Sequence, residues 1–250
     1  RRLGSGGTAV ALEVEKEGAI SVLKVARTPE VNARVQAEGE VLAKLRHPRI
    51  VAYYETLEIA GHTAIRTPKA GDETLAHRLR DEGTLSLDLL QRFGEDLLEA
   101  VAHLEAVGIP HRDIKPDNLG IAPFGKNDEL HLVLFDFSLA RARLDDIDAG
   151  TDGYIEPFLK LRRSPRWDLH AERWAAAIVL YQMATGAFPR WGDGKSDPAL
   201  VECDATIDAA SFDPSIRDPL AVFFAKSFQR NPGDRFDNTE SLRLAWRQVF

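Results

Sequence analysis

Four polar side chains near the middle of the sequence have the types and the spacing needed to move a phosphoryl group. The segment HRDIKPDN, residues 111–118, contains Asp113, Lys115 and Asn118, and Asp136 follows it downstream. Phosphoryl transfer depends mostly on positioning and charge neutralisation, so it needs a proton acceptor, cations and metal-binding oxygens. These residues therefore predict transfer of the terminal phosphoryl group of ATP to a hydroxyl.

Each of these side chains has its own predicted role. Asp113 is the candidate base; because a carboxylate is a weak base for an alcohol at neutral pH, it would mainly orient the hydroxyl and accept its proton late. Lys115 would neutralise the transferred γ-phosphoryl group. Asn118 and Asp136 offer hard oxygen ligands, which suit Mg²⁺ bridging phosphates. His111 is expected to be a packed, structural histidine instead.

A glycine-rich turn near the start of the chain is the predicted cover for the phosphates. Glycine permits positive φ and a close backbone approach, so amide N–H groups can reach phosphate oxygens. The turn departs from the GxGxxG pattern because Ala9 stands in the third position, and a flexible hairpin turn explains it about as well. With two positions of the neighbouring strands, the predicted nucleotide-binding set is Gly4, Ser5, Gly6, Gly7, Thr8, Ala11 and Val22.

Lys24 lies among apolar neighbours in the strand-like segment Val22-Leu23-Lys24-Val25. A lysine in such a segment is better explained as pointing into a cleft, where it would bind the α- and β-phosphates, than as a surface group. It then needs a carboxylate partner. Glu38, ten residues before Pro48, has the suitable position on the following helix. Glu40 is the alternative, but it points about 200° away around the helix and is expected on the solvated face.

The first part of the chain has the patterns of strands and of one helix. Segments rich in small and β-branched residues predict strands, and an apolar stripe at helical spacing predicts a helix that ends near His47-Pro48. The predicted strands are 8–14, 20–26, 50–59 and 63–67, and the predicted helix is 31–45. A polar stretch over 68–73 is the predicted hinge, and the residue at the back of the nucleotide pocket falls at Arg66 or Thr67.

Helical patterns dominate after the hinge. Apolar stripes, or a nearly continuous apolar surface in one case, predict helices over 87–104, 172–185, 219–227 and 239–249. Gly108 is expected to stop the first of these helices. Residues 123–129 are expected to form the tip of an extended hairpin before Asp136.

The composition limits the class of protein. The 250 residues are 44% hydrophobic and 28% charged, as in ordinary globular domains. No apolar run approaches the roughly 20 residues that span a bilayer, and a net charge of −7 argues against direct binding to nucleic acid or an anionic membrane. The single cysteine, Cys203, excludes an internal disulfide framework and favours a cytoplasmic location. Because the chain starts at Arg1 without Met, we expect it to be a segment of a larger protein with other domains.

The motifs from His111 to Ala140, together with Gly150-Thr151, resemble those of eukaryotic-like serine/threonine protein kinases. The resemblance extends over nearly the whole chain. It implies an α+β, two-lobed protein-kinase fold, in which a small antiparallel β-sheet lobe with one helix precedes a larger, mainly helical lobe. The implied organisation is a single domain over 1–250, with lobes at 1–67 and 74–250 and the hinge at 68–73.

The resemblance also implies cofactors, partners and one further site residue. ATP and Mg²⁺ are the implied cofactors, and proteins are the implied substrates. Thr151 is implied to hydrogen-bond Asp113 and Lys115, and the pair Lys115 and Thr151 resembles serine/threonine kinases rather than tyrosine kinases. The phrases at 135–140, 171–173 and 191–194 are similar to those of the kinases in bacterial phage-growth-limitation (type 2 BREX) systems, which implies a role in anti-phage defence.

Besides Ala9, three positions depart from the kinase pattern. Ser138 replaces the glycine of DFG and should restrict a backbone flip without removing the metal ligand. Phe158 stands where a glutamate is expected, so the usual partner of Arg235 is missing, and Glu156 is a candidate substitute. Glu172 replaces an aspartate, and this longer carboxylate could still accept hydrogen bonds from the catalytic-loop backbone.

The segment between Leu139 and Gly150 contains no serine, threonine or tyrosine. Many kinases with an arginine before the catalytic aspartate, as Arg112 is here, need a phosphate in this segment to pair with it. Here the segment offers Asp145, Asp146 and Asp148. The hypothesis is that one of these carboxylates pairs with Arg112, or that no partner is needed; a solvated acidic loop is an equal alternative.

Two other functions are open at this point. A pseudokinase, which keeps the fold as a binding or scaffold module, would explain the departures at Ala9, Ser138 and Phe158. A small-molecule kinase of the aminoglycoside type would share the chemistry but take another substrate class; Pro116 and Thr151 argue against it.

Overall fold

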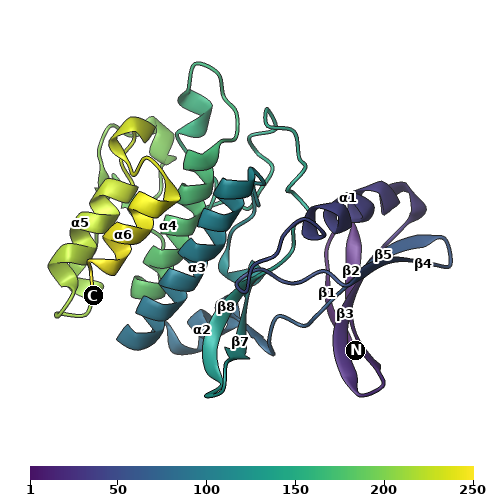
Figure 1. The fold of residues 1–250 in the computed structure, drawn as a ribbon. Coiled ribbons are helices and arrows are strands. Elements are labelled where there is room, and N and C mark those ends of the chain that lie inside the picture. Colours follow the sequence, from purple (N-terminus) through teal and green to yellow (C-terminus); the bar gives the residue numbers. More distant parts are fainter.

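The computed structural model describes residues 1–4 and 6–250 and shows two lobes of unequal size (Figure 1). The smaller lobe is a five-stranded antiparallel sheet in the order β1-β2-β3-β5-β4, with one helix packed on it. Its elements are β1 (Arg2–Ser5), β2 (Ala9–Lys16), β3 (Ala19–Ala26), α1 (Asn32–Leu42), β4 (Glu55–Ile59) and β5 (His62–Thr67).

One face of this sheet carries the side chains that matter for the site. Side chains alternate along a strand, so Val22 and Lys24 of β3 point to the same face. In the register of the sheet, Lys24 lies opposite Ala11 of β2 and Ile65 of β5. α1 approaches this face closely at Gly39, where an added Cβ would lie only 2.8 Å from Cγ2 of Ile65. Glycine at this position therefore lets α1 lie against the sheet.

The larger lobe is mainly helical and is built around α4, which is buried over nearly its whole length. Its helices are α2 (Leu75–Glu82), α3 (Leu87–Val107), α4 (Leu169–Thr185), α5 (Arg217–Ser227) and α6 (Thr239–Arg247). Its strands are β6 (Glu73–Thr74), β7 (Leu119–Phe124), β8 (Glu129–Leu134), β9 (Arg190–Trp191) and β10 (Ala205–Thr206), arranged as the sheets β6-β7-β8 and β10-β9. Single-turn 3-10 helices occur at Pro29–Val31, Pro116–Asn118, Leu159–Leu161, Pro198–Leu200, Ala209–Ser211 and Pro232–Asp234.

The predicted α+β, two-lobed fold is confirmed by this arrangement. The hairpin expected at 123–129 is the β7–β8 hairpin, and α3 ends at Gly108, whose φ of 68° is the left-handed conformation typical of glycine after a helix. The helix predicted over 31–45 is shorter, because α1 ends at Leu42. In the described part of the chain, no helix is long and apolar enough to cross a membrane.

The strand predicted over 50–59 is wrong in its first half. β4 starts only at Glu55, because the backbone at residues 49–51 pairs with the larger lobe. The Val51 N–H donates to the Leu134 carbonyl, and the Leu134 N–H donates to the Arg49 carbonyl, each at 2.9 Å. The segment after α1 therefore joins the two lobes along the end of β8.

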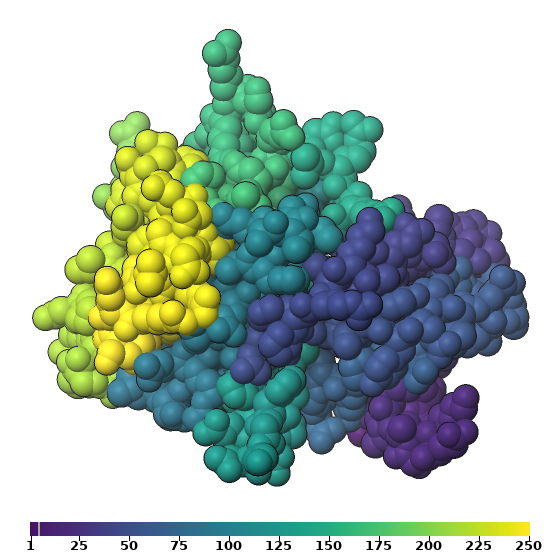
Figure 2. Space-filling view, in the orientation of Figure 1, coloured from purple at the N-terminus to yellow at the C-terminus, as the bar shows by residue number. Residues whose placement is uncertain are grey.

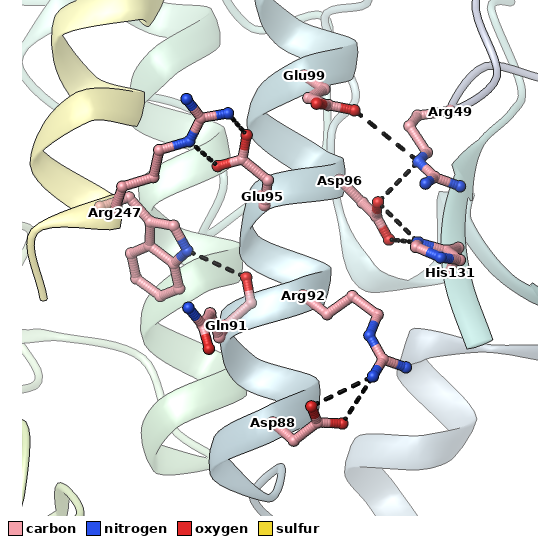
Figure 3. Close-up of a pocket in the computed structure, with 10 residues that line it drawn as sticks. Arg49, Asp88, Gln91, Arg92, Glu95, Asp96, Glu99, His131 and Arg247 are labelled. Atoms are coloured by element: carbon pink, nitrogen blue, oxygen red, sulfur yellow. Dashed lines mark hydrogen bonds and ion pairs between the residues drawn. The ribbon is translucent and has the colours of Figure 1, made fainter. Parts of the chain in front are cut away.

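A group of charged residues on α3 holds the same segment (Figure 3). Asp96 of α3 forms an ion pair with Arg49, with 2.7 Å between Nε and Oδ1. Its other oxygen accepts the Leu132 N–H at 3.0 Å and lies 2.9 Å from Nδ1 of His131. These side chains line a cleft of about 380 Å³ on α3. The side chain of Asp96 is 4% exposed and that of Arg49 14%, so water screens this pair poorly.

Replacing Asp96 by alanine tests the contribution of this network. The change leaves the largely buried Arg49 with only its longer contact to Glu99, at 3.9 Å, and losing one partner of a buried ion pair costs about 3–5 kcal/mol of unfolding free energy. We expect urea denaturation to show this loss with an unchanged m value. Asp88→Ala is the control, because Asp88 pairs with Arg92 on the same helix but is 71% exposed; its loss should cost no more than about 1 kcal/mol. Equal losses in the two variants would contradict the account.

Candidate active site

Lys24 lies between two carboxylates from distant parts of the chain. Its Nζ is 2.9 Å from Oε1 of Glu38 on α1 and 2.7 Å from Oδ1 of Asp136, which follows β8. The side chain of Glu38 is 3% exposed and that of Lys24 20%, so these contacts are largely withdrawn from water. The structure thus places Glu38 against Lys24. Glu40, the other candidate, pairs with Arg141 at 2.9 Å.

The charges in this group determine which protonation states are present. Burial disfavours the ammonium, but Glu38 and Asp136 outweigh burial and raise the pKa of Lys24. Burial also acts to raise the pKa of Asp136, yet Lys24 and the Ser138 side chain outweigh it and hold that pKa at about 2. At neutral pH Lys24 is therefore charged and Asp136 is ionised, as binding of phosphates and of a metal ion requires.

The backbone of Asp136 is left-handed, with a φ of 67°. This conformation is uncommon for a residue with a side chain and persists only where its surroundings hold it. Phe137, the next residue, is 1% exposed, and its ring meets the ring of His111 edge to face at 4.6 Å. These contacts, with the Lys24 ion pair, keep Asp136 in the cleft.

His111 is fully buried, as expected for a structural residue. Its Nδ1 accepts the Asp113 N–H at 3.2 Å, so its Nε2–H donates to the Phe135 carbonyl at 3.0 Å. Burial lowers the pKa of His111, and the ring is neutral. The histidine therefore connects the backbone before Asp113 with the backbone before Asp136.

Asp113, Lys115 and Thr151 form one hydrogen-bonded cluster. The Thr151 hydroxyl donates to Oδ1 of Asp113 at 2.6 Å and accepts from Nζ of Lys115 at 2.6 Å. Nζ of Lys115 also lies 2.9 Å from Oδ2 of Asp113. One hydroxyl group thus connects the candidate base and the candidate cation, which lie within hydrogen-bonding distance of each other.

Asn118 and Asp136 retain oxygens that suit a divalent cation. The side-chain amide of Asn118 donates to the Asp113 carbonyl at 2.8 Å and to Oδ2 of Asp113 at 3.1 Å, which leaves its Oδ1 as an acceptor. Within the described residues, the hydrogen bonds to Asp136 from Lys24 and Ser138 both end on Oδ1, which leaves Oδ2. Two hard oxygens with space for water and phosphate ligands suit Mg²⁺. Residues 1–4 and 6–250 contain no group of three or more His, Cys, Asp or Glu side chains that would hold a metal ion alone.

The glycine turn lies between β1 and β2, at the edge of the sheet. The Gly6 N–H donates to the Ala9 carbonyl at 3.0 Å, and an added Cβ at Gly4, Gly6 or Gly7 would meet no atom within 4 Å. None of these three glycines has a positive φ, so the turn is formed without left-handed backbone at these positions. Thr8 is half-buried, and Ser5 lies outside the described residues.

The two strand positions predicted to contact the nucleotide lie on the face of Lys24. Ala11 is directly opposite Lys24, and Val22 is on the same side of β3 and opposite Thr67. Thr67 therefore shares this face. Arg66 points to the other face, where it pairs with Glu55 at 2.7 Å.

Glu172, in the first turn of α4, accepts hydrogen bonds from the backbone of the catalytic loop, residues 111–118. Its carboxylate accepts the N–H groups of His111 at 3.1 Å and Arg112 at 2.8 Å, and the indole N–H of Trp167 at 2.7 Å. The side chain thus reaches the loop backbone, as proposed for a glutamate in place of aspartate. The hydrogen bond from Trp167 to Glu172 was not predicted, because nothing in the residue spacing indicates it.

The structure places Glu156 where it substitutes for the glutamate that Phe158 replaces. Oε1 of Glu156 accepts from Arg235 at 2.9 Å, and Oε2 pairs with Arg162. Phe158 packs edge to face on Trp174, with ring centroids 5.6 Å apart. The buried ion pair to Arg235 is therefore present, with its carboxylate displaced by two residues.

Of the alternatives left open for Arg112, pairing with a carboxylate of the segment 139–150 is not found among the described residues. Its guanidinium donates to the backbone carbonyls of Arg143 at 2.8 Å and Asp146 at 2.5 Å, and it stacks on the Trp167 ring at 5.0 Å. Asp145, one of the three candidate partners, is held by Arg143 instead. Burial lowers the pKa of Arg112, and carbonyl groups stabilise the cation where a charged partner was expected.

Comparison with known proteins defines the class. The family model described as "Protein kinase domain" matches residues 1–247. With the two-lobed fold and the contacts described above, the match shows that the chain belongs to the protein kinase domain family. The resemblance to protein kinases predicted from the motifs is confirmed.

Among curated proteins, the "Probable kinase PglW" of Streptomyces coelicolor is 39% identical over 283 aligned residues, which confirms the second resemblance. That alignment covers the whole chain but only 18% of the relative. Human calcium/calmodulin-dependent protein kinase type 1B is 27% identical, with 98% of the chain and 73% of that protein covered. The serine/threonine-protein kinase AtPK1/AtPK6 of Arabidopsis thaliana is 28% identical, with 80% of the chain and 44% of that protein covered.

Glu172 predicts a pH dependence of stability. Burial outweighs the three hydrogen bonds and raises the pKa of this carboxyl from its ordinary 4.5 to about 7. A carboxyl with a raised pKa in the folded state contributes stability that is complete below its unfolded pKa and is lost as pH rises through the folded pKa. We therefore expect the free energy of unfolding to fall between pH 4.5 and about 7 because of this group.

Glu172→Gln cannot ionise and should remove this part of the slope. Urea denaturation of both proteins across the same pH interval measures the difference. An identical slope in the variant and the unchanged protein would show that Glu172 does not titrate there.

Proposed function

We propose that this chain is an active, Mg²⁺-dependent kinase domain that transfers the γ-phosphoryl group of ATP to serine or threonine hydroxyls of proteins. The observation that carries the proposal is the simultaneous contact of Lys24 with Glu38 and Asp136. A lysine paired with the helix glutamate and an aspartate placed for the metal ion are both needed for transfer in protein kinases.

The nucleotide would be bound between the glycine turn and the face of Lys24. Lys24 would bind the α- and β-phosphates while Glu38 keeps its ammonium in place. Oδ1 of Asn118 and Oδ2 of Asp136 would hold Mg²⁺, which supplies neutralisation of the phosphate charge when bound. Val22 and Ala11 would form the apolar contact on the sheet side.

The acceptor hydroxyl would be handled by the cluster around Thr151. Asp113 orients the hydroxyl and accepts its proton, and Lys115 neutralises charge on the transferred group. Because the Thr151 hydroxyl bonds to both, the base and the cation keep one geometry through the reaction. This arrangement supports serine/threonine over tyrosine specificity.

The pseudokinase alternative loses most of its support in this geometry. Ser138 leaves Asp136 in contact with Lys24, and Glu156 substitutes for the carboxylate absent at Phe158. The family match to protein kinases likewise favours protein substrates over small molecules.

We also propose that the kinase acts in bacterial defence against phage, in the cytoplasm and within a larger protein. The identity with PglW and the phrases shared with phage-growth-limitation kinases support this role. The proposed organisation is a single domain over 1–250, with lobes at 1–67 and 74–250 and a hinge at 68–73. With a net charge of −7, the domain would bind proteins and ATP, and neither nucleic acid nor a membrane directly.

Lys24→Ala and Asp136→Ala should each lower kcat/KM for phosphorylation of a protein substrate by roughly a thousandfold, because each removes charge that acts on the transferred phosphate. Circular dichroism should show folded variants. Lys44→Ala, which removes an exposed lysine just after α1, is the control and should leave the rate unchanged. Near-normal activity in both variants would remove the phosphoryl-transfer proposal.

The carbonyl contacts of Arg112 predict activity without phosphate in the segment 139–150. Protein treated with phosphatase, and then freed of it, should keep most of its initial rate with Mg-ATP and a peptide substrate. Loss of all activity after the treatment, with recovery on rephosphorylation, would show that the domain needs a phosphate and would contradict this prediction.

A further inference from the structure

The loop over 163–166, just before α4, has the features of a phosphate acceptor. Its sequence is Arg163-Ser164-Pro165-Arg166, and all four residues are exposed. In Figure 2 the segment that contains this loop projects from the top of the larger lobe. We propose that Ser164 is phosphorylated by a second copy of the same kinase, an inference that rests on the function proposed above.

The Ser164 hydroxyl is the available one in this part of the molecule. Between Leu139 and Asp168 the hydroxyl side chains are Thr151, Tyr154 and Ser164. The Thr151 hydroxyl is bound to Asp113 and Lys115, and the buried Tyr154 donates to Gln182 at 2.9 Å. Ser164 is exposed, and no hydrogen bond to its side chain is present within residues 1–4 and 6–250.

Both ends of the loop are held by buried contacts. On one side Arg162 pairs with Glu156 and with Asp168, the residue that caps α4. On the other side Trp167 is 2% exposed, and its backbone N–H donates to the Leu144 carbonyl at 2.7 Å. A four-residue loop fastened at both ends keeps Ser164 at the surface. Transfer from the catalytic site of the same molecule would require these contacts to break, so a second molecule is the natural donor.

The backbone and the charge of the loop suit entry into a catalytic cleft. Pro165 favours an extended conformation at Ser164, the shape in which a main chain can lie along a cleft. Within the described residues, Arg163 and Arg166 form no ion pair, so the loop carries two free cations beside its hydroxyl. At the catalytic site, the exposed carboxylates of Asp117 and Asp152 lie close in sequence to Asp113 and Thr151. Opposite charges favour the encounter of the two surfaces.

The same arginines would stabilise the product. A phosphoserine carries a charge of about −1.5 to −2 at neutral pH, which two neighbouring arginines can neutralise through charge-assisted hydrogen bonds. Lys160 is paired with Asp197, and Arg162 with its two carboxylates. Arg163 and Arg166 are thus the cations left for the phosphate.

The transfer balances with ATP as the donor. Oγ of Ser164 forms a bond to the γ-phosphorus, and the bond from that phosphorus to the oxygen shared with the β-phosphate breaks. ADP leaves with that oxygen, and the serine proton passes to Asp113 of the catalytic copy.

A mixing experiment tests the proposal on the complete protein. Protein with Asp113→Asn serves as the acceptor, protein with Ser164→Ala serves as the active donor, and phosphopeptides are mapped after incubation with Mg-ATP. We expect phosphate on Ser164 of the acceptor at an initial rate proportional to donor concentration. Replacing both arginines, Arg163→Ala and Arg166→Ala, in the acceptor should lower that rate about tenfold through lost charge contacts. Ser215, which is exposed but hydrogen-bonded to Asp213, should stay unmodified.

A basic test protein in the same reaction separates this proposal from the proposed function. Phosphate on the test protein with none on Ser164 would overturn the inference and leave the kinase activity standing. No transfer to either would overturn both. If the rate of Ser164 modification in the unchanged protein does not depend on its concentration, the second-copy route is wrong.

Discussion

The ammonium group of Lys24 is the contact on which the arrangement of the site depends. It meets one carboxylate from α1 and another from the segment after β8. The Lys24 ammonium thus connects three segments that are distant in sequence, namely β3, α1 and the segment after β8. Because each carboxylate is partly shielded from water, loss of either leaves charge that the surroundings solvate poorly. The position of α1 and the direction of Asp136 are therefore linked.

A second constraint is the hydrogen bonding of the catalytic-loop backbone to Glu172 of α4. Glu172 accepts two consecutive backbone N–H groups and the Trp167 indole, and Trp167 in turn stacks on Arg112. The loop is thus held by a carboxylate, an aromatic ring and two carbonyl groups of the segment after it. In this arrangement the cation of Arg112 is satisfied without an added phosphate, which moves any role of phosphorylation to other positions, such as Ser164.

The local motifs allowed much of the site to be predicted. Asp113, Lys115 and Asn118 are close in sequence, so their residue types alone indicate chemistry, and Glu38 follows from its position on a predicted helix. The α+β, two-lobed fold followed from a strand-rich start and a helix-rich remainder. The role of Glu156 could also be predicted, because Arg235 needs a carboxylate partner and Phe158 cannot supply one.

The remaining features depend on contacts that periodicity does not encode. The strand pattern at 51–54 indicates extended backbone but does not say that its partner is β8 in the other lobe. The acidic residues after Leu144 suggested a carboxylate for Arg112, yet Asp145 is already bound by Arg143, and backbone carbonyls are present in every sequence. Trp167 contacts Glu172 and Arg112, and the spacing of these residues in the sequence does not indicate that the three lie together.

The central claim is that Asp113 acts in transfer and not in nucleotide binding. Single-turnover phosphorylation of a serine peptide, combined with calorimetric titration of Mg-ATP, measures the two separately for the unchanged protein and for Asp113→Asn. The account predicts that the variant binds Mg-ATP with nearly unchanged affinity and transfers phosphate at a rate lower by roughly two to four orders of magnitude. Equal transfer rates for the two proteins would contradict it.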